Sequence, residues 1–262
     1  MYTSLRYDVK LAKAMPLFDP TTLVLIGSIV FIASMVNGLC GFGFALVAVP
    51  FMMLFLSPKT VIPLITLTSL ALDAAILLEA RRHVEWRKVA SLMAPGIAGM
   101  LVGVWLLTYL GIGSLKLYIG VIITLFALAS LMGLRRDFEN EGAATVFAGF
   151  LAGLLGGSSS IPGPPIVLFF QNQKMAKETF RANLIAFLLS LYVVTIPMYI
   201  MNGLITWELT RASLIFVVPV LLGAGVGIRL SYRIDEASFK KIVLVLVTLA
   251  GFMSILTGLG IV

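Results

Sequence analysis

The stretch from residue 21 to residue 57 reads TTLVLIGSIVFIASMVNGLCGFGFALVAVPFMMLFLS, and it decides the fold class. It holds no charged residue, and the nearest charges are Asp19 before it and Lys59 after it. A helix needs about 20 apolar residues to cross the hydrocarbon core of a bilayer. The stretch is therefore too long for one crossing, and the glycines near its middle predict a break between two helices.

The whole composition agrees with a membrane environment. Hydrophobic residues make up 60% of the 262 residues and charged residues 12%, which is about half the charged share of a soluble domain. The mean hydropathy is +1.07. A soluble helical protein with a large core would need long charged helix faces, and the sequence has none. The net charge of +7 comes from basic residues in short loops between apolar segments, a pattern typical of membrane orientation rather than nucleic-acid binding.

Signals for other classes of protein are missing. The first fifteen residues contain Arg6, Asp8, Lys10 and Lys13 and no apolar core, so we expect no cleavable signal peptide. A single cysteine excludes an intrachain disulfide. Without an HExxH motif, a Cys/His cluster or a nucleotide-binding loop, the sequence predicts no enzyme, no metal site and no cofactor.

Charges, glycine clusters and prolines divide the chain into ten apolar segments. They are residues 21–39, 43–56, 60–80, 88–110, 115–134, 142–156, 163–173, 179–203, 208–230 and 237–260. The second and seventh are short, so each is either a half-helix or a re-entrant piece. The prediction is an all-α integral membrane protein with about 8–10 transmembrane segments and short or broken helices at the Gly-rich breaks.

The basic residues indicate an orientation. If all ten segments cross, thirteen Lys and Arg residues lie on one side of the membrane and six on the other. Cytoplasmic loops are enriched in Lys and Arg. The richer side, which includes Arg81, Arg82, Arg135 and Arg136, is therefore predicted to be cytoplasmic, with both termini outside.

The two halves of the chain resemble each other. Three residues of the first half recur at a constant spacing of 115: Gly38, Gly41 and Pro50 match Gly153, Gly156 and Pro165. Five segments per half is an odd number, so the second half is predicted to be inverted, as in many secondary transporters. The predicted organisation is an N-terminal extramembrane segment (1–20), a first repeat (21–134), a cytoplasmic linker (135–141) and a second, inverted repeat (142–262).

The Gly-rich breaks at residues 37–43 and 153–165 are the candidate site. Non-helical backbone at membrane depth is tolerated where protein or a water-filled cavity satisfies its amides. A helix that starts after such a break has free N–H groups and a partial positive charge, which suits an oxyanion without a buried Lys or Arg. Prolines fit the first turn of such a helix. Two inverted halves could aim two helix starts at one central point.

Polar and small residues near the breaks are the predicted substrate-binding set. They are Asn37, Gly38, Cys40, Gly41, Gly43, Gly156, Gly157, Ser158, Ser159, Ser160, Pro162, Gln171 and Asn172. The alternative is that these glycines only permit close helix packing, which is the interpretation we adopt for Gly99, Gly103, Gly223 and Gly227.

Three further residues are candidates for a vestibule or for coupling: Asp73, Arg181 and Asn183. A carboxylate within a membrane segment is costly and is by default a functional hypothesis, so Asp73 could carry a proton. The alternative is a snorkelling or hydrogen-bonded Asp73 without such a role. Arg181 also fits a simple orientation charge.

The breaks, the prolines that follow them and the order of segments resemble the sulfite exporter TauE/SafE family. The resemblance runs from about Leu23 to Gly260 and is strongest in Asn37-Gly38-x-x-Gly41-x-Gly43 through Pro50 and in Gly149-x-x-x-Gly153-x-x-Gly156-Gly157 through Pro165. It implies export of sulfite, sulfonates or related anions across the bacterial inner membrane. Members often have nearly contiguous glycines at both breaks, whereas Cys40 and Phe42 interrupt the first break here and three serines stand in the second.

The leading functional hypothesis is alternating-access transport of a small oxyanion, coupled to protons or ions. The expected partners are a small anionic substrate and the lipid bilayer, with no nucleic acid, and a homodimer is compatible with the sequence. A passive channel for small anions or solutes is the first alternative. A membrane scaffold or an intramembrane enzyme with unfamiliar residues is the second.

Overall fold

The computed structural model describes residues 19–40, 42–132, 141–173, 175–230 and 236–261. For Cys40, Glu79, Gln171, Lys177 and residues 236–242 it describes the backbone alone. Residues 1–18 of the predicted N-terminal segment and residues 135–140 of the predicted linker lie outside these ranges. Within them the chain forms helices and short connections without a strand, so the predicted all-α class is confirmed there.

A helix coincides with each of the ten predicted apolar segments. The helices are α2 (Pro20–Cys40), α3 (Phe44–Met52), α4 (Pro58–Ala80), α5 (Trp86–Tyr109), α6 (Ile112–Leu131), α7 (Glu141–Ser159), α8 (Gly163–Asn172), α9 (Lys177–Met201), α10 (Trp207–Leu230) and α11 (Glu236–Gly258). A single 3-10 turn, η1 (Arg81–His83), follows α4.

The second and seventh segments form short helices, as predicted. Helix α3 has 9 residues and α8 has 10, so each rises only about 14–15 Å, half the thickness of the hydrocarbon core of a bilayer. Seven described helices are long and apolar enough to cross a membrane: α2, α4, α5, α6, α7, α9 and α10. The described apolar part of α11, Val243–Gly258, is shorter. The chain is therefore a multi-pass membrane protein.

The distribution of side chains also fits a bilayer. Large apolar side chains face outward, among them Leu78 (70% exposed) and Val193 (74% exposed). Polar side chains such as Thr68 and Asn183 are instead fully buried between helices. Lipid can solvate the outer apolar surface, whereas polar groups within the membrane need protein partners.

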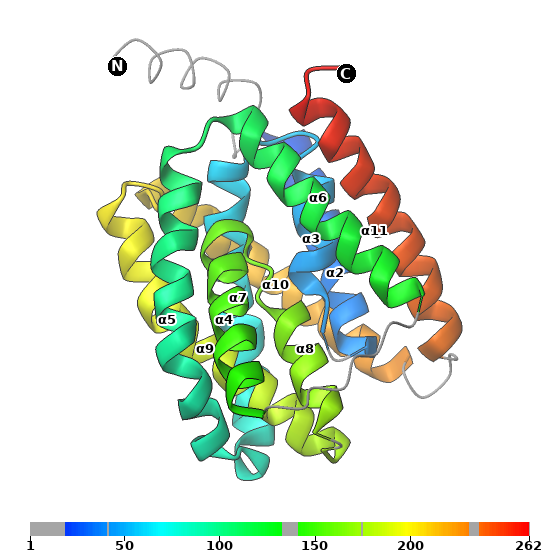
Figure 1. The fold of residues 1–262 in the computed structure, drawn as a ribbon. Helices are drawn as coiled ribbons and strands as arrows, with labels where there is room; N and C mark the ends of the chain where they lie inside the picture. The colour runs from blue at the N-terminus through cyan, green and yellow to red at the C-terminus, as the bar shows by residue number, and fades with distance from the viewer. Residues whose placement is uncertain (1–18, 41, 133–140, 174, 231–235, 262) are drawn as a thin grey trace.

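Three helix pairs have the most extensive contacts: α5 with α7, α2 with α10, and α6 with α11. In Figure 1, α5 lies beside α7 and α6 lies beside α11. Glycines permit the close approach of the first two pairs. A Cβ atom at Gly99 or Gly103 would overlap the backbone of α7, and one at Gly223 or Gly227 would overlap the backbone of α2. The prediction that these four glycines serve helix packing is confirmed.

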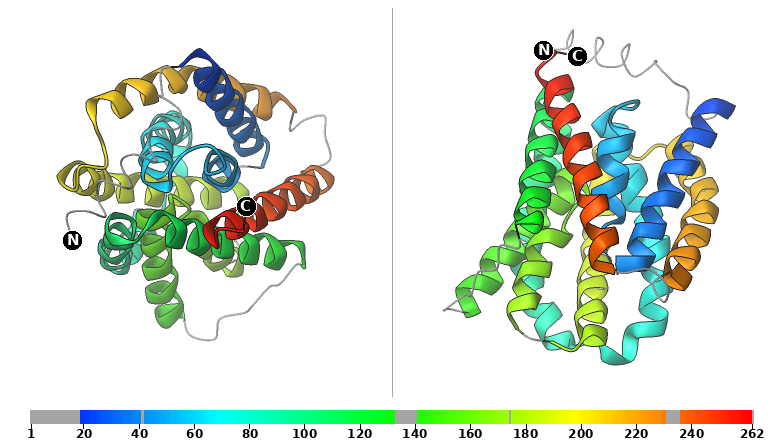
Figure 2. Two further views of the ribbon diagram at one scale, coloured as in Figure 1. Left: turned by 90° about the horizontal axis from the view of Figure 1, so that it is seen from above. Right: turned by 90° about the vertical axis from the view of Figure 1, so that its right-hand side faces the viewer.

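The helix ends gather at two ends of the molecule. The start of α2 and the end of α11 lie at one end, at the top of Figure 1 and of the right-hand view of Figure 2. The turn η1 and the start of α9 lie at the opposite end. A hydrogen bond of 2.7 Å from the backbone N–H of Glu85 to Oδ1 of Asn183 joins these two segments. These two segments therefore lie at the same end of the molecule.

Candidate functional site

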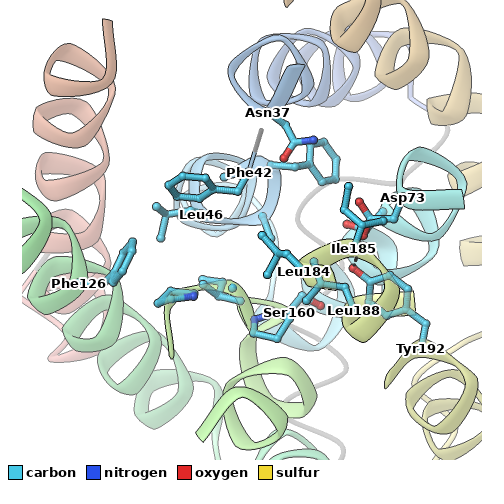
Figure 3. A pocket seen from close by; sticks show the side chains of 18 residues that line it. Asn37, Phe42, Leu46, Asp73, Phe126, Ser160, Leu184, Ile185, Leu188 and Tyr192 are labelled. Carbon is cyan, nitrogen blue, oxygen red and sulfur yellow. Dashed lines mark hydrogen bonds between the residues drawn. The ribbon is translucent and has the colours of Figure 1, made fainter. Parts of the chain in front are cut away.

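A cavity lies inside the bundle where both chain breaks meet α4 and α9 (Figure 3). Its volume is about 60 Å³, which leaves room for several water molecules. The end of α2, the starts of α3 and α8, the middle of α4 and α9, and Phe126 of α6 line it. Segments from both halves of the chain therefore contribute to one cavity.

The break between α2 and α3 turns on Gly43. Its φ of 110° lies in the left-handed region, which glycine adopts without the steric cost of a Cβ atom. The first helical hydrogen bond of α3 runs from the N–H of Val47 to the carbonyl of Gly43 at 3.0 Å. The amides of residues 44–46 therefore precede the helical ladder, and these three residues line the cavity.

The break between α7 and α8 turns on Ser160. It has a φ of 56°, and its hydroxyl donates to the carbonyl of Ile62 at 2.9 Å and contacts the Thr66 hydroxyl. These bonds connect the segment between α7 and α8 to α4. Helix α8 begins three residues later at Gly163, followed by Pro164 and Pro165.

The two helix starts differ in the donors that they offer. Proline has no backbone N–H, so residues 164 and 165 remove two of the four free amides of the first turn of α8. Helix α3 begins with Phe-Ala-Leu and keeps all of its first-turn amides. An anion in the cavity would therefore find more donors at the start of α3 than at the start of α8.

Asp73 and Tyr192 face each other across the cavity wall. The hydroxyl of Tyr192 donates to Oδ2 of Asp73 at 3.0 Å, as the dashed line in Figure 3 shows. Both side chains are buried, at 6% and 7% exposure. Ser69, one helical turn before Asp73, also lines the cavity.

The cavity has little fixed positive charge. Among its described lining residues, Asp73 is the one carboxyl group, and Lys, Arg and His are absent from that set. Favourable electrostatics for an anion would come from the positive ends of the α3 and α8 dipoles and from backbone amides. Such a site resembles the oxyanion geometry expected from the sequence, with one acidic group added to it.

Five of the predicted residues line the cavity. They are Asn37, Gly43, Asp73, Ser160 and Pro162. Asn37 and Gly43 come from the first break, Ser160 and Pro162 from the second, and Asp73 from the helix between them. The expectation that the two breaks meet at one point therefore agrees with the geometry.

Eight other predicted residues are absent from the cavity lining: Gly38, Gly156, Gly157, Ser158, Ser159, Asn172, Arg181 and Asn183. Gly38 packs on the backbone of Ala224 in α10, and a Cβ atom at Gly157 would come within 2.8 Å of the Met100 carbonyl in α5. A Cβ atom at Gly156 would meet Pro162 at 3.2 Å, behind the lining.

The remaining serines of the second break belong to the last turn of α7. The hydroxyls of Ser158 and Ser159 donate to the carbonyls four residues earlier, at 2.6 and 2.7 Å. Ser158 also hydrogen-bonds the Tyr118 hydroxyl at 3.1 Å. Their hydroxyls satisfy helix carbonyls and a neighbouring helix instead of facing the cavity.

The residues predicted for a vestibule lie outside the cavity. The Asn183 side chain accepts a hydrogen bond from the Glu85 amide near η1, and Arg181 lies two residues earlier on α9. Asn172 lines a separate hollow together with Lys88 and Glu141. Gly41 and the side chains of Cys40 and Gln171 lie outside the described residues.

Sequence reasoning missed the wall that α9 supplies. Leu184, Ile185, Leu188 and Tyr192 line the cavity at helical spacing. In the sequence they belong to a continuous apolar run, where a buried helix gives no stripe. Tyr192 was the one polar group in that set, and an isolated tyrosine in an apolar segment carries no motif.

Comparison with known proteins adds one match. A family model described as sulfite exporter TauE/SafE matches residues 26–254, which is most of the chain. No curated protein and no solved structure matches it. The resemblance found in the sequence is confirmed.

Proposed function

Because the chain belongs to the sulfite exporter TauE/SafE family, we propose that it is a secondary transporter of a small oxyanion such as sulfite or an organosulfonate. The single observation that carries the proposal is the cavity in which the starts of α3 and α8 meet. Broken helices that aim their N-termini at an anion near the midplane are a recurrent device of secondary transporters. The exposed apolar surface faces lipid, and the proposed location is the bacterial inner membrane.

We propose in addition that the two halves are inverted repeats. In support, the ends of α2 and α7 are 119 residues apart, and so are the starts of α3 and α8. Asp73 and Tyr192 are separated by 119 residues as well. Helices α2 and α7 run in opposite directions in Figure 1, as inversion requires.

Helix packing supports the same proposal. The contacts of α2 with α10 and of α5 with α7 exchange with each other when the halves are exchanged, and the contact of α6 with α11 is unchanged. Gly38 meets the carbonyl of Ala224, and Gly157 meets that of Met100 in the equivalent way. Such symmetry would let one half rock against the other around the cavity.

The register of 119 differs by one helical turn from the spacing of 115 in the glycine match. Glycines at the α5–α7 contact recur every four residues, at positions 149, 153 and 157. An alignment of the two halves that relies on glycines can therefore be shifted by one helical turn and still pair glycine with glycine. The helix ends favour a register of 119, because each helix has one start and one end, whereas similar glycines recur every four residues.

Flux into liposomes tests the proposed function. We expect uptake of sulfite or isethionate by the reconstituted protein to saturate with concentration and to accelerate when the same solute is present inside. These are properties of a carrier that reorients with its solute. Linear uptake without such acceleration would indicate the alternative of a channel. Absence of flux for every sulfur oxyanion, with folding confirmed, would contradict transport and favour a scaffold.

A further inference from the structure

The cavity combines an anion-favouring geometry with a buried carboxyl group. Asp73 shares the space with the starts of α3 and α8 and is 6% exposed. It accepts a hydrogen bond from the hydroxyl of Tyr192, a neutral donor that leaves the charge of a carboxylate uncompensated. Two negative charges close together in one buried cavity repel each other more strongly than they would in bulk water.

Nothing described around Asp73 offers a compensating cation. Helix α3 has no titratable residue, and α9 contributes Tyr192, with Tyr199 two turns further along the same helix. The other described titratable side chains on α4 and on the elements that contact it do not line the cavity: Lys59, Arg81, Arg82, His83, Arg87, Lys88, Tyr109, Lys116, Tyr118, Glu141, Glu178, Arg181, Glu208, Arg211 and Arg229. The cavity therefore has no described basic group that could neutralise both an anion and an ionised Asp73.

We propose that Asp73 is protonated whenever an anion occupies the cavity, so that each singly charged anion crosses together with one proton. This inference rests on the proposed transport function and concerns the same site. The carboxylate takes the proton from water on the side to which the cavity is open and returns it to water on the other side. The protonated carboxyl group accepts from Tyr192 through one oxygen and donates its own O–H into the cavity, where it can bind the anion.

The proposal fixes the sign of the coupling. Anion and proton move in the same direction, and the loaded carrier has gained no net charge. An inward proton gradient then favours entry of the anion. The anion leaves the cell when its own outward gradient exceeds the inward proton gradient. Transport of a monovalent anion is electroneutral, and the membrane potential leaves its rate unchanged.

Isethionate is a suitable probe because its sulfonate stays singly charged between pH 5 and 9, unlike sulfite. We expect isethionate affinity to fall by up to about tenfold per pH unit once Asp73 ionises, since one proton is linked to binding. In Asp73→Asn, a neutral side chain of similar shape, affinity is expected to remain near the low-pH value at every pH. Tyr109→Phe is the control and is expected to keep the pH dependence of the wild type.

A second measurement uses the wild type alone. Isethionate is added to weakly buffered protein at a pH at which Asp73 is ionised. The protein is expected to take up about one proton per bound anion, and a pH-sensitive dye follows this uptake. In liposomes whose membrane potential is clamped with potassium and valinomycin, isethionate flux through the wild type is expected to be independent of that potential. Flux through the Asp73→Asn variant is expected to depend on it.

The outcomes separate the two proposals. Saturable isethionate flux with pH-independent affinity and no proton uptake would overturn the coupling and leave transport intact. Tighter binding of taurine than of isethionate at high pH would also overturn it, because the taurine ammonium would then pair with an ionised Asp73. Absence of binding and flux for isethionate, methanesulfonate and sulfite would overturn the proposed function and the coupling with it.

Discussion

The hydroxyl of the buried Tyr192 donates a hydrogen bond of 3.0 Å to Oδ2 of the buried Asp73 and joins two helices from opposite halves of the chain. The bond connects α9 to α4 at the wall of the cavity. The two residues are 119 positions apart, the spacing that also relates the ends of α2 and α7. In the proposed repeat they occupy equivalent positions, so the bond lies where the two halves meet.

Removal of this donor is expected to destabilise the protein. Tyr192→Phe keeps the ring and leaves a buried carboxyl oxygen without its partner, at a cost of about 1–3 kcal/mol. Thermal unfolding in detergent measures the loss as a lower Tm. Tyr109→Phe removes the same atom from a side chain that is 68% exposed and is expected to change Tm little. An equal Tm for the wild type and Tyr192→Phe would show that the hydrogen bond contributes nothing to stability.

The glycines of α10 provide a matched pair for helix packing. A Cβ atom at Gly223 would overlap the Phe31 carbonyl and the Ser34 hydroxyl, whereas one at Gly225 meets nothing within 4 Å. Gly223→Ala is expected to push α10 from α2 and to cost about 1–3 kcal/mol. Gly225→Ala is expected to stabilise the helix by up to about 1 kcal/mol. Thermal unfolding of both variants checks that Tm falls for Gly223→Ala and rises for Gly225→Ala. Similar Tm changes in the two variants would contradict the close packing of α10 on α2 at Gly223.

The start of α3 depends on a glycine conformation. Gly43→Ala places a side chain at a φ of 110° and is expected to cost about 1–3 kcal/mol. It is also expected to weaken isethionate binding, because the first amides of α3 would shift. Gly163→Ala at the start of α8 meets nothing within 4 Å and lies outside the left-handed region. Its thermal stability is expected to match the wild type, and a loss as large as that of Gly43→Ala would refute the argument from φ.

Labelling tests the proposed orientation. In a Cys40→Ala background, the exposed positions Arg82 and Asn202 lie at opposite ends of the bundle. Arg82→Cys is expected to react with a membrane-impermeant maleimide in inside-out vesicles, and Asn202→Cys in right-side-out vesicles. The reason is the cytoplasmic enrichment of Lys and Arg around η1. The reverse pattern would invert the topology, and labelling of both positions from one side would contradict the assigned crossings.

Much of the fold could be predicted because membrane insertion follows local composition. Each apolar run contributes its own transfer free energy to insertion, so the presence of ten helices followed from charges, glycines and prolines alone. Their ends were predicted less well: the segment 43–56 forms a helix that ends at Met52. The two short helices were predicted for the same reason. The seven residues from Asn37 to Gly43 were taken as one break, but α2 continues to Cys40, since glycines remain helical where a neighbouring helix packs on them.

The candidate site was predictable only in part. The sequence placed Gly43 and Ser160 within the two predicted breaks, and the structure shows that the chain turns at both. It gave no reason to separate Gly157 from Gly43, since a glycine reads the same at a helix contact and at a break. Tyr192 carried no signal, because its importance lies in facing Asp73, and that proximity depends on the packing of α9 against α4.

The sequence by itself determined that the chain lies in a bilayer, the approximate position of each helix, and which loops are basic, because each of these depends on residues close together along the chain. The tertiary structure alone decided which glycines pack, which helix starts reach the cavity, and that Asp73 meets Tyr192 beside them. Those relationships depend on the distances between helices that are remote in sequence. Close helix packing fixes these distances, and no local pattern of residues contains them.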